Sequence, residues 1–275
     1  MKQVISASRR TDIPAFYLNW FMDQIQQGFV EIPNPFNRKQ IRRVSLSPGD
    51  TAWIIFWSRN YSSFLKNYQF FNYYRLFFHF TINPPHSLLE PDMISPLKAL
   101  KQLEKLVAIY GPEVIIWRYD PLVFFKHDGQ LESNHQLTVF RRYLREISRL
   151  GIQKCYTSFV FLYPKVLKRA RQLPQIKFFD PELNQKNQIL QEMVDLASIY
   201  GVQIYSCSND LLLKVNGMKK GHCIDGLLLN QLGSERVSER FLPTRSDCAC
   251  TASIDVGDYV RTACKYHCRY CYARR

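Results

Sequence analysis

Three cysteines near the end of the sequence have the spacing most able to carry chemistry. Cys264, Cys268 and Cys271 follow the pattern C-x3-C-x2-C. Three thiolates on one short loop can ligate three of the four irons of a [4Fe–4S] cluster and leave the fourth iron open. The alternative is a zinc site completed by His267 or His222, because zinc prefers four nitrogen or sulfur ligands. The spacing alone leaves both kinds of site open.

Four more cysteines are candidates for a second metal site. They are Cys207, Cys223, Cys248 and Cys250. Four thiolates suit either a second [4Fe–4S] cluster or an all-thiolate zinc site. Their spacing is irregular, so a set of thiols without metal is the third reading. Cys155 stands alone in an apolar segment and is interpreted as a core residue.

Six apolar segments rich in β-branched and aromatic residues predict the strands that position these thiols. They are Val4–Ser8, Trp53–Trp57, Phe77–Ile82, Val114–Tyr119, Cys155–Val160 and Val202–Ser206. Segments with helical periodicity lie between them, and several end at a glycine. Regular alternation of strands and helices implies parallel strands joined by crossovers.

The predicted fold is α/β, with a partial or full parallel (β/α) barrel of about six to seven strands. A barrel is preferred to a doubly wound sheet because no glycine-rich dinucleotide fingerprint follows the first predicted strand. Residues 1–206 are predicted to form the barrel core. Residues 207–275 are predicted to form a Cys-rich, cluster-binding region packed on the same domain.

Polar residues gather where the predicted strands end, which is where barrel active sites lie. The candidate catalytic residues are Arg9, Arg10, Asp12, Arg118 and Asp120. The candidate cofactor-binding residues are Trp57, Asn60, His79, Asn83 and Tyr270. Period-two alternation puts His79 with Asn83, and Arg118 with Asp120, on one face of their strands. The alternatives are salt-bridged loops for the charged groups and ordinary packing for Trp57.

The cysteine loop resembles that of the radical-SAM superfamily, in which an aromatic residue precedes the third cysteine, as Tyr270 does here. Its exit, Cys271-Tyr-Ala-Arg274, is also similar to that of spore-photoproduct-lyase-like proteins. Over nearly its whole length the sequence resembles the uncharacterised domain-of-unknown-function 1848 family. Besides the cysteines, the resembling blocks are Ser6–Pro14, Asn34–Asn37, Arg118–Pro121 and Cys223–Gly226.

This resemblance implies an enzyme that binds S-adenosylmethionine (SAM) at the open iron. An electron from a ferredoxin or flavodoxin would cleave SAM, and the 5′-deoxyadenosyl radical would attack a substrate. In that superfamily the cluster loop usually follows the first strand, whereas here it ends the sequence. A circular permutation in which Tyr259–Ala263 supplies the missing strand would reconcile the two.

Composition limits the partners. The net charge of +14 over 275 residues favours a polyanionic partner such as nucleic acid, with a solvated basic surface as the alternative. The sequence has no long apolar run and no signal-peptide pattern, so we expect a cytoplasmic protein without a membrane span. The alternative to an enzyme is a non-enzymatic protein, stabilised by zinc or an iron–sulfur cluster, that binds nucleic acid or senses redox state.

Overall fold

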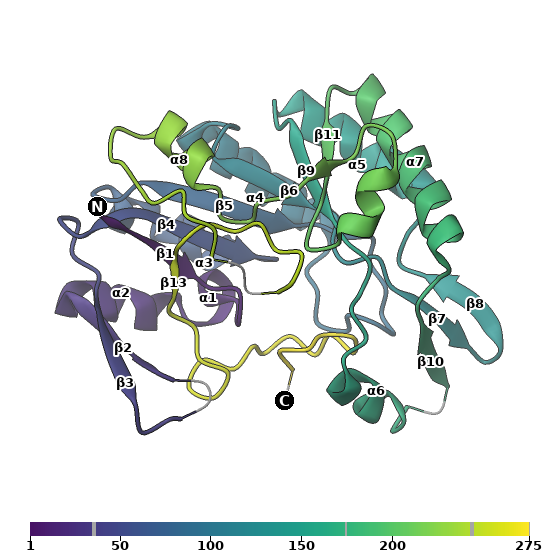
Figure 1. The fold of residues 1–275 in the computed structure, drawn as a ribbon, viewed down its shortest axis with the longest axis horizontal. Coiled ribbons are helices and arrows are strands. Elements are labelled where there is room, and N and C mark those ends of the chain that lie inside the picture. The colour runs from purple at the N-terminus through teal and green to yellow at the C-terminus, as the bar shows by residue number, and fades with distance from the viewer. Residues whose placement is uncertain (35–36, 174, 243–244, 275) are drawn as a thin grey trace.

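A parallel β-sheet organises the computed structural model, which describes residues 1–34, 37–173, 175–242 and 245–274. Its strands are β1 (Gln3–Ala7), β4 (Thr51–Ser58), β5 (Leu76–Thr81), β6 (Ile115–Arg118), β9 (Lys154–Thr157), β11 (Gln203–Ser206), β12 (Lys219–Lys220) and β13 (Ile254–Asp255). They lie in the order β12-β11-β9-β6-β5-β4-β1-β13, and every neighbouring pair is parallel (Figure 1). The α/β class and the six predicted strands are confirmed.

Helices connect these strands and cover much of the sheet. They are α1 (Ile13–Phe16), α2 (Leu18–Gln27), α3 (Ser62–Lys66), α4 (Pro96–Tyr110), α5 (Leu137–Arg149), α6 (Pro164–Ala170), α7 (Leu183–Ile199) and α8 (Gly226–Leu232), with 3-10 turns at Tyr68–Phe71 and Asp210–Lys214. The predicted glycine stop after α2 is confirmed, because Gly28 takes the left-handed conformation with φ +84°.

Two small antiparallel sheets were not predicted. One pairs β2 (Phe29–Pro33) with β3 (Ile41–Ser45), and the other joins β10 (Ile176–Phe179), β7 (Phe124–His127) and β8 (Gln130–Ser133). Both lie at the side of the molecule where the C-terminal loop runs (Figure 1).

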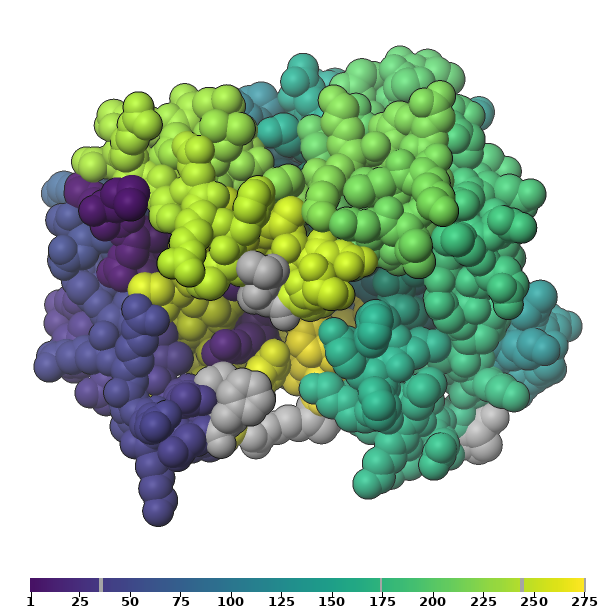
Figure 2. Space-filling model, in the orientation of Figure 1, coloured from purple at the N-terminus to yellow at the C-terminus, as the bar shows by residue number. Residues whose placement is uncertain are grey.

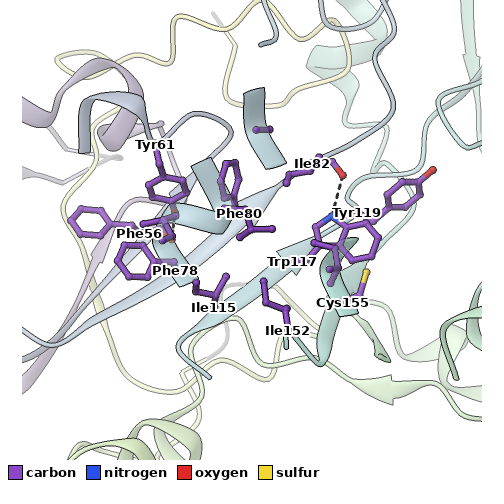
Figure 3. Packing of buried hydrophobic residues seen from close by; sticks show 14 of the residues in the cluster. Phe56, Tyr61, Phe78, Phe80, Ile82, Ile115, Trp117, Tyr119, Ile152 and Cys155 are labelled. Atoms are coloured by element: carbon purple, nitrogen blue, oxygen red, sulfur yellow. Dashed lines mark hydrogen bonds between the residues drawn. The ribbon is translucent and has the colours of Figure 1, made fainter. Parts of the chain in front are cut away.

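One face of the main sheet carries the aromatic core. Phe78 and Phe80 of β5 and Trp117 of β6 are fully buried there against the helices (Figure 3). Trp117 donates from its indole nitrogen to the carbonyl oxygen of Ile82 at 3.2 Å, so the buried ring leaves no polar atom unpaired.

The opposite face carries the polar residues that the alternation predicted. His79 pairs with Ile116 and stacks on Trp57, and Arg118 pairs with Thr81 on the neighbouring strand. Leu229 of α8 and other residues of the C-terminal region pack on this face. Burial on both faces explains why the strands are almost continuously apolar.

The predicted strand at Tyr259–Ala263 is wrong. The chain returns to the sheet earlier, at β13, and then turns. Asp258 accepts a hydrogen bond from the backbone of Val260, and Thr262 donates from its backbone to the carbonyl oxygen of Asp258. These local bonds hold a turn instead of a strand.

The structure bears on two further predictions, the Asn34–Asn37 block and the absence of a membrane span, only for the residues that it describes. Pro35 and Phe36, in the middle of the Asn34–Asn37 block, lie outside the described residues. In the described residues, no helix has the length and apolar character needed to cross a bilayer.

His135 makes a testable contribution to stability. Burial lowers its pKa from the ordinary 6.5 to about 4. The unfolded chain therefore binds a proton that the folded chain rejects, and stability present above pH 6.5 is lost as the pH falls towards 4, by up to about 3 kcal/mol. Urea unfolding of His135→Gln should show a smaller loss between these pH values than the parent protein. An equal loss in both would show that His135 does not contribute.

Candidate functional site

A single carboxylate joins the two ends of the chain. Asp255 of β13 accepts hydrogen bonds from the hydroxyls of Ser6 (2.8 Å) and Ser8 (2.6 Å) and from the backbone N–H of Arg9 (2.8 Å). The backbone N–H of Gly257 donates to it at 3.0 Å. A Cβ on Gly257 would lie 2.0 Å from the Ser8 hydroxyl, so the close approach requires glycine. The loop that follows β13 therefore starts beside the end of β1.

The loop of residues 259–274 has no helix or strand and is held by contacts with the rest of the fold. Tyr17 donates from its hydroxyl to the carbonyl oxygen of Ala263 at 2.6 Å. The backbone N–H of Arg269 donates to the carbonyl oxygen of Leu89 at 2.9 Å. These bonds fix the loop on both sides of its central cysteine.

The three cysteines of this loop are set into an apolar surrounding. Burial raises the pKa of the Cys264 thiol to about 11 and also raises that of Cys268. The backbone N–H of Ala273 donates to the sulfur of Cys271 at 3.4 Å, and that of Cys271 to the carbonyl oxygen of Cys268 at 3.2 Å. Without a bound cation, Cys264 and Cys268 are protonated at neutral pH.

Tyr270 holds this loop through a buried network. Its hydroxyl donates to the carboxylate of Glu90 and accepts from Arg59 at 2.8 Å. Arg59 and Glu90 form an ion pair at 2.8 Å, and the Glu90 side chain is 3% exposed. Burial raises the pKa of Tyr270 well above its usual value. Tyr270, which was predicted to bind a cofactor, thus uses its hydroxyl group to bind Glu90 and Arg59.

The other four cysteines meet over the polar face of the sheet. Cys207 follows β11, Cys223 precedes α8, and the sulfurs of these two lie 3.3 Å apart. Cys250 is hydrogen-bonded through its side chain to Cys223 and to Cys248. The four sulfur atoms therefore form one continuous row, in the order Cys207, Cys223, Cys250 and Cys248.

Arg118 faces this row of sulfur atoms. It donates to the sulfur of Cys223 at 3.1 Å and to that of Cys207 at 3.5 Å, and it also pairs with Asp120 at 2.6 Å. Burial alone would lower the pKa of Arg118, but Asp120 and the sulfurs hold it well above its usual value. Ser158 donates to the second oxygen of Asp120. Arg118 and Asp120 therefore form a fixed pair that presents positive charge to two thiols.

Arg9 lies between the two thiol sets. Its carbonyl oxygen accepts from the hydroxyl of Tyr272, the neighbour of Cys271, at 3.1 Å. Its side chain is close enough to Asp255 and to Cys250 for both to raise its pKa against the effect of burial. Its Nη1 is buried without a hydrogen-bond partner.

Three other predicted site residues have their side chains engaged in local structure. Asp12 caps α1, accepting from the backbone N–H of Ala15 at 2.9 Å and from the Ser58 hydroxyl at 2.7 Å, and burial raises its pKa to about 6. Asn60 accepts from the backbone of residue 62 and from Gln102. Asn83 exchanges two hydrogen bonds with the backbone of residue 120. The Ser58 hydroxyl contacts both Asp12 and the carbonyl oxygen of Asn60, whereas Asn83 is bound at residue 120.

Trp57 and His79 lie on the face that holds the second thiol set. Their rings stack at 4.8 Å with a 4° interplanar angle. The Nε2 atom of His79 contacts the carbonyl oxygen of Cys223 at 2.7 Å, and its Nδ1 atom is buried without a partner. Burial, and then Arg118, hold the His79 pKa well below 6.5. His79 is therefore neutral and positions the chain at Cys223.

Among the described residues, no three His, Cys, Asp or Glu side chains are arranged so that they could hold one metal ion. This applies to both thiol sets as they stand. A single ion requires its ligands to converge on one point. The ligands of an iron–sulfur cluster bind separate irons and do not need to converge in that way.

Some site residues were not predicted from the sequence. Glu90 lies in a loop with no motif. Asp255 offered no signal either, because Ile254 is the only apolar residue directly before it and Ser253 is polar. Arg59 stands with Trp57 and Asn60 at the end of the second predicted strand, but its ion pair with Glu90 was not predicted.

Fold and site together define a parallel α/β protein whose last strand delivers a three-cysteine loop to one edge of the sheet. The sequence matches the family described as Domain of unknown function (DUF1848) over residues 4–273. The chain belongs to this family. Comparison with curated proteins gives no match.

Solved structures resemble the fold only distantly. A D-hydantoinase matches with 14% identity and a TM-score of 0.34, covering 60% of this chain and 36% of its own. The D-hydantoinase of a Bacillus sp. AR9 matches with 12% identity and a TM-score of 0.33, with the same coverage. The chain thus spans about a third of the length of these proteins.

Asp255→Ala should detach the C-terminal loop. The substitution leaves two buried hydroxyls and two backbone N–H groups without their acceptor, at a cost of about 3 kcal/mol. We expect faster cleavage by trypsin after Arg261 and Lys265 and a lower unfolding midpoint. Asp195→Ala, an exposed change on α7, is the control. Equal cleavage rates in the two variants would contradict the role assigned to Asp255.

Proposed function

We propose that the chain is an iron–sulfur enzyme of the radical-SAM type, with a [4Fe–4S] cluster on Cys264, Cys268 and Cys271. SAM is the proposed co-substrate, and a ferredoxin or flavodoxin the proposed electron donor. The observation that carries the proposal is the order of strands in the main sheet, because it gives the cysteine loop the position that such an enzyme requires.

The strand order also supports a permuted barrel. Starting from β13, the neighbours across the sheet are β1, β4, β5, β6, β9, β11 and β12, which is chain order with the last strand moved to the front. Doubly wound sheets reverse their order at a switch point, whereas barrels keep it. We therefore propose a partial (β/α) barrel, circularly permuted, whose cysteine loop follows its first strand in space.

The donor set of the loop fits a cluster in three respects. Its three thiols lie on one short segment, they are shielded by Tyr266 and Tyr270, and a backbone N–H points at the sulfur of Cys271. Hydrogen bonds to sulfur and exclusion of solvent are the means by which proteins tune such clusters. Because burial disfavours the thiolate, cluster binding must release protons from Cys264 and Cys268.

A bound cluster with SAM would supply reductive cleavage to a 5′-deoxyadenosyl radical. The chain's own residues do the positioning. Arg59, Glu90 and Tyr270 fix the loop from inside, and the apolar surrounding of the thiols excludes water from the reactive region.

Metal and product analysis test this function. Anaerobically reconstituted protein should contain about four irons and four sulfides on this loop, and Cys264→Ala should lose them. After reduction with SAM, the parent should form 5′-deoxyadenosine and Cys264→Ala should not. Cys155→Ala is the matched control, because Cys155 is buried in the core away from both sets. A cluster without 5′-deoxyadenosine would favour redox sensing, and no iron would refute the proposal.

We also propose a second iron–sulfur centre on Cys207, Cys223, Cys248 and Cys250. It is supported by the row of four neighbouring thiols from separate segments and by the charges of Arg118 and Arg9 beside them. Buried arginines facing sulfur stabilise thiolates, which are the form that binds metal. The spacing lacks the paired C-x2–4-C arrangement usual in structural zinc sites.

The second centre predicts a stoichiometry. Parent protein should hold about eight irons, and Cys223→Ala about four, with the loop cluster and its spectrum retained. Iron, sulfide and zinc are measured per chain, again with Cys155→Ala as control. One zinc lost in Cys223→Ala would reassign the set to zinc. Unchanged metal content would contradict a second centre.

A further inference from the structure

Three cations surround two tyrosines beside the cysteine loop. The Arg10 guanidinium lies 5.7 Å from the ring of Tyr259, and Lys165 lies 5.8 Å from the same ring and 5.5 Å from that of Tyr272. Arg245 lies 5.7 Å from the Tyr272 ring. These five residues, called here the cation–tyrosine cluster, come from four separate stretches of the chain.

The positive charge of this cluster is poorly neutralised by the protein. In the described part of the chain, neither Lys165 nor Arg245 forms an ion pair with a carboxylate, and both are exposed. Arg10 donates to the carbonyl oxygen of Gly257 at 3.1 Å and lies 4.0 Å from Asp255, a carboxylate that already accepts four hydrogen bonds and pairs with Arg9. Three converging cations with so little compensation attract an anion.

The surrounding surface extends the same charge. Residues 161–173 contain four cations and no acid, and residues 259–274 contain another four and no acid. The two stretches touch, since Arg169 donates to the carbonyl oxygens of Cys271 and Arg274. Figure 1 shows the C-terminal loop running beside α6. Figure 2 shows a hollow near the centre of this face, with atoms of the C-terminal region inside it.

Aromatic rings continue from the cluster to the surface. Tyr163 packs against Tyr272 with ring centroids 5.6 Å apart and against Phe161 at 4.5 Å. Phe161 is 64% exposed, so its outer face is open to a planar ligand. Cations that bind phosphate beside rings that stack on bases are the means by which proteins hold single-stranded nucleic acid.

We propose that the cation–tyrosine cluster, with Phe161 and Tyr163, binds a nucleotide unit of single-stranded nucleic acid. The phosphate is held by Arg10, Lys165 and Arg245, and the base stacks on Phe161. An acidic partner protein would use the same cations but would gain nothing from an exposed stacking ring. As a substrate site this surface rests on the proposed function, because Tyr272 adjoins Cys271. As a binding site it does not.

Fluorescence anisotropy with a labelled oligodeoxyadenylate of about twelve nucleotides tests the site on the full chain. The double variant Lys165→Gln/Arg245→Gln should weaken binding and reduce the log–log salt slope by about 1.4, at roughly 0.7 for each lost phosphate contact. Phe161→Leu should weaken binding at least about fivefold without changing that slope. Competition by deoxyadenosine monophosphate distinguishes a site for a free nucleotide from a site for a nucleic-acid strand.

The matched control is Arg141→Gln/Arg142→Gln, which removes the same charge from exposed positions on α5. Retained binding in this control supports the site. The proposal is overturned by an equal loss in both double variants, by absence of oligonucleotide binding at low salt, or by tight binding of an acidic flavodoxin alone through Lys165 and Arg245. Iron and 5′-deoxyadenosine are measured on the same batches, so failure of the enzyme proposal is recognised separately.

Discussion

The Asp255 carboxylate is the interaction that anchors the C-terminal region, and with it the three-cysteine loop, to the end of β1. Strand β13 has only two residues, and two pairings join it to β1. So short a strand cannot hold a C-terminal region by its backbone alone. Hydrogen bonds to a buried carboxylate are stronger than neutral ones and can hold it. Cys248 and Cys250 precede this point in the chain and the three-cysteine loop follows it, so this junction connects the two thiol sets.

Buried guanidinium groups shape the chemistry of the thiols. Burial raises the pKa of Cys264 and Cys268, which keeps them protonated in the free chain. Arg59 opposes this effect at Cys268, and Arg118 does so at Cys207. Each arginine is itself paired with a carboxylate, Glu90 or Asp120, so the protein alone fixes its orientation. The proposed metal centres would use this arrangement, because groups behind metal ligands set the charge and direction of those ligands.

Local patterns predicted the sheet well. The six strands of the sequence were recovered because each is a short apolar run with its own periodicity, and His79 and Arg118 were assigned to the correct face for the same reason. The position of β13 was missed because two residues carry no pattern of their own. It forms through contacts with residues about 250 positions away, such as Ser6 and Ser8. Likewise, Asp12 and Asn60 have side chains typical of active sites, yet serve as caps and turn residues, a choice that only the neighbouring chain decides.

The charge of the surface and that of the buried thiols are not independent. Arg245 belongs to the cation–tyrosine cluster and is also close enough to Cys207 for the two to affect each other's protonation. An anion bound at Arg10, Lys165 and Arg245 would reduce the positive potential at that thiol and so disfavour its thiolate. Thermodynamic linkage makes the effect reciprocal, so a more negative thiol set would weaken anion binding. Binding of an anion at the proposed site would thus be connected, through Arg245, to the state of the second thiol set.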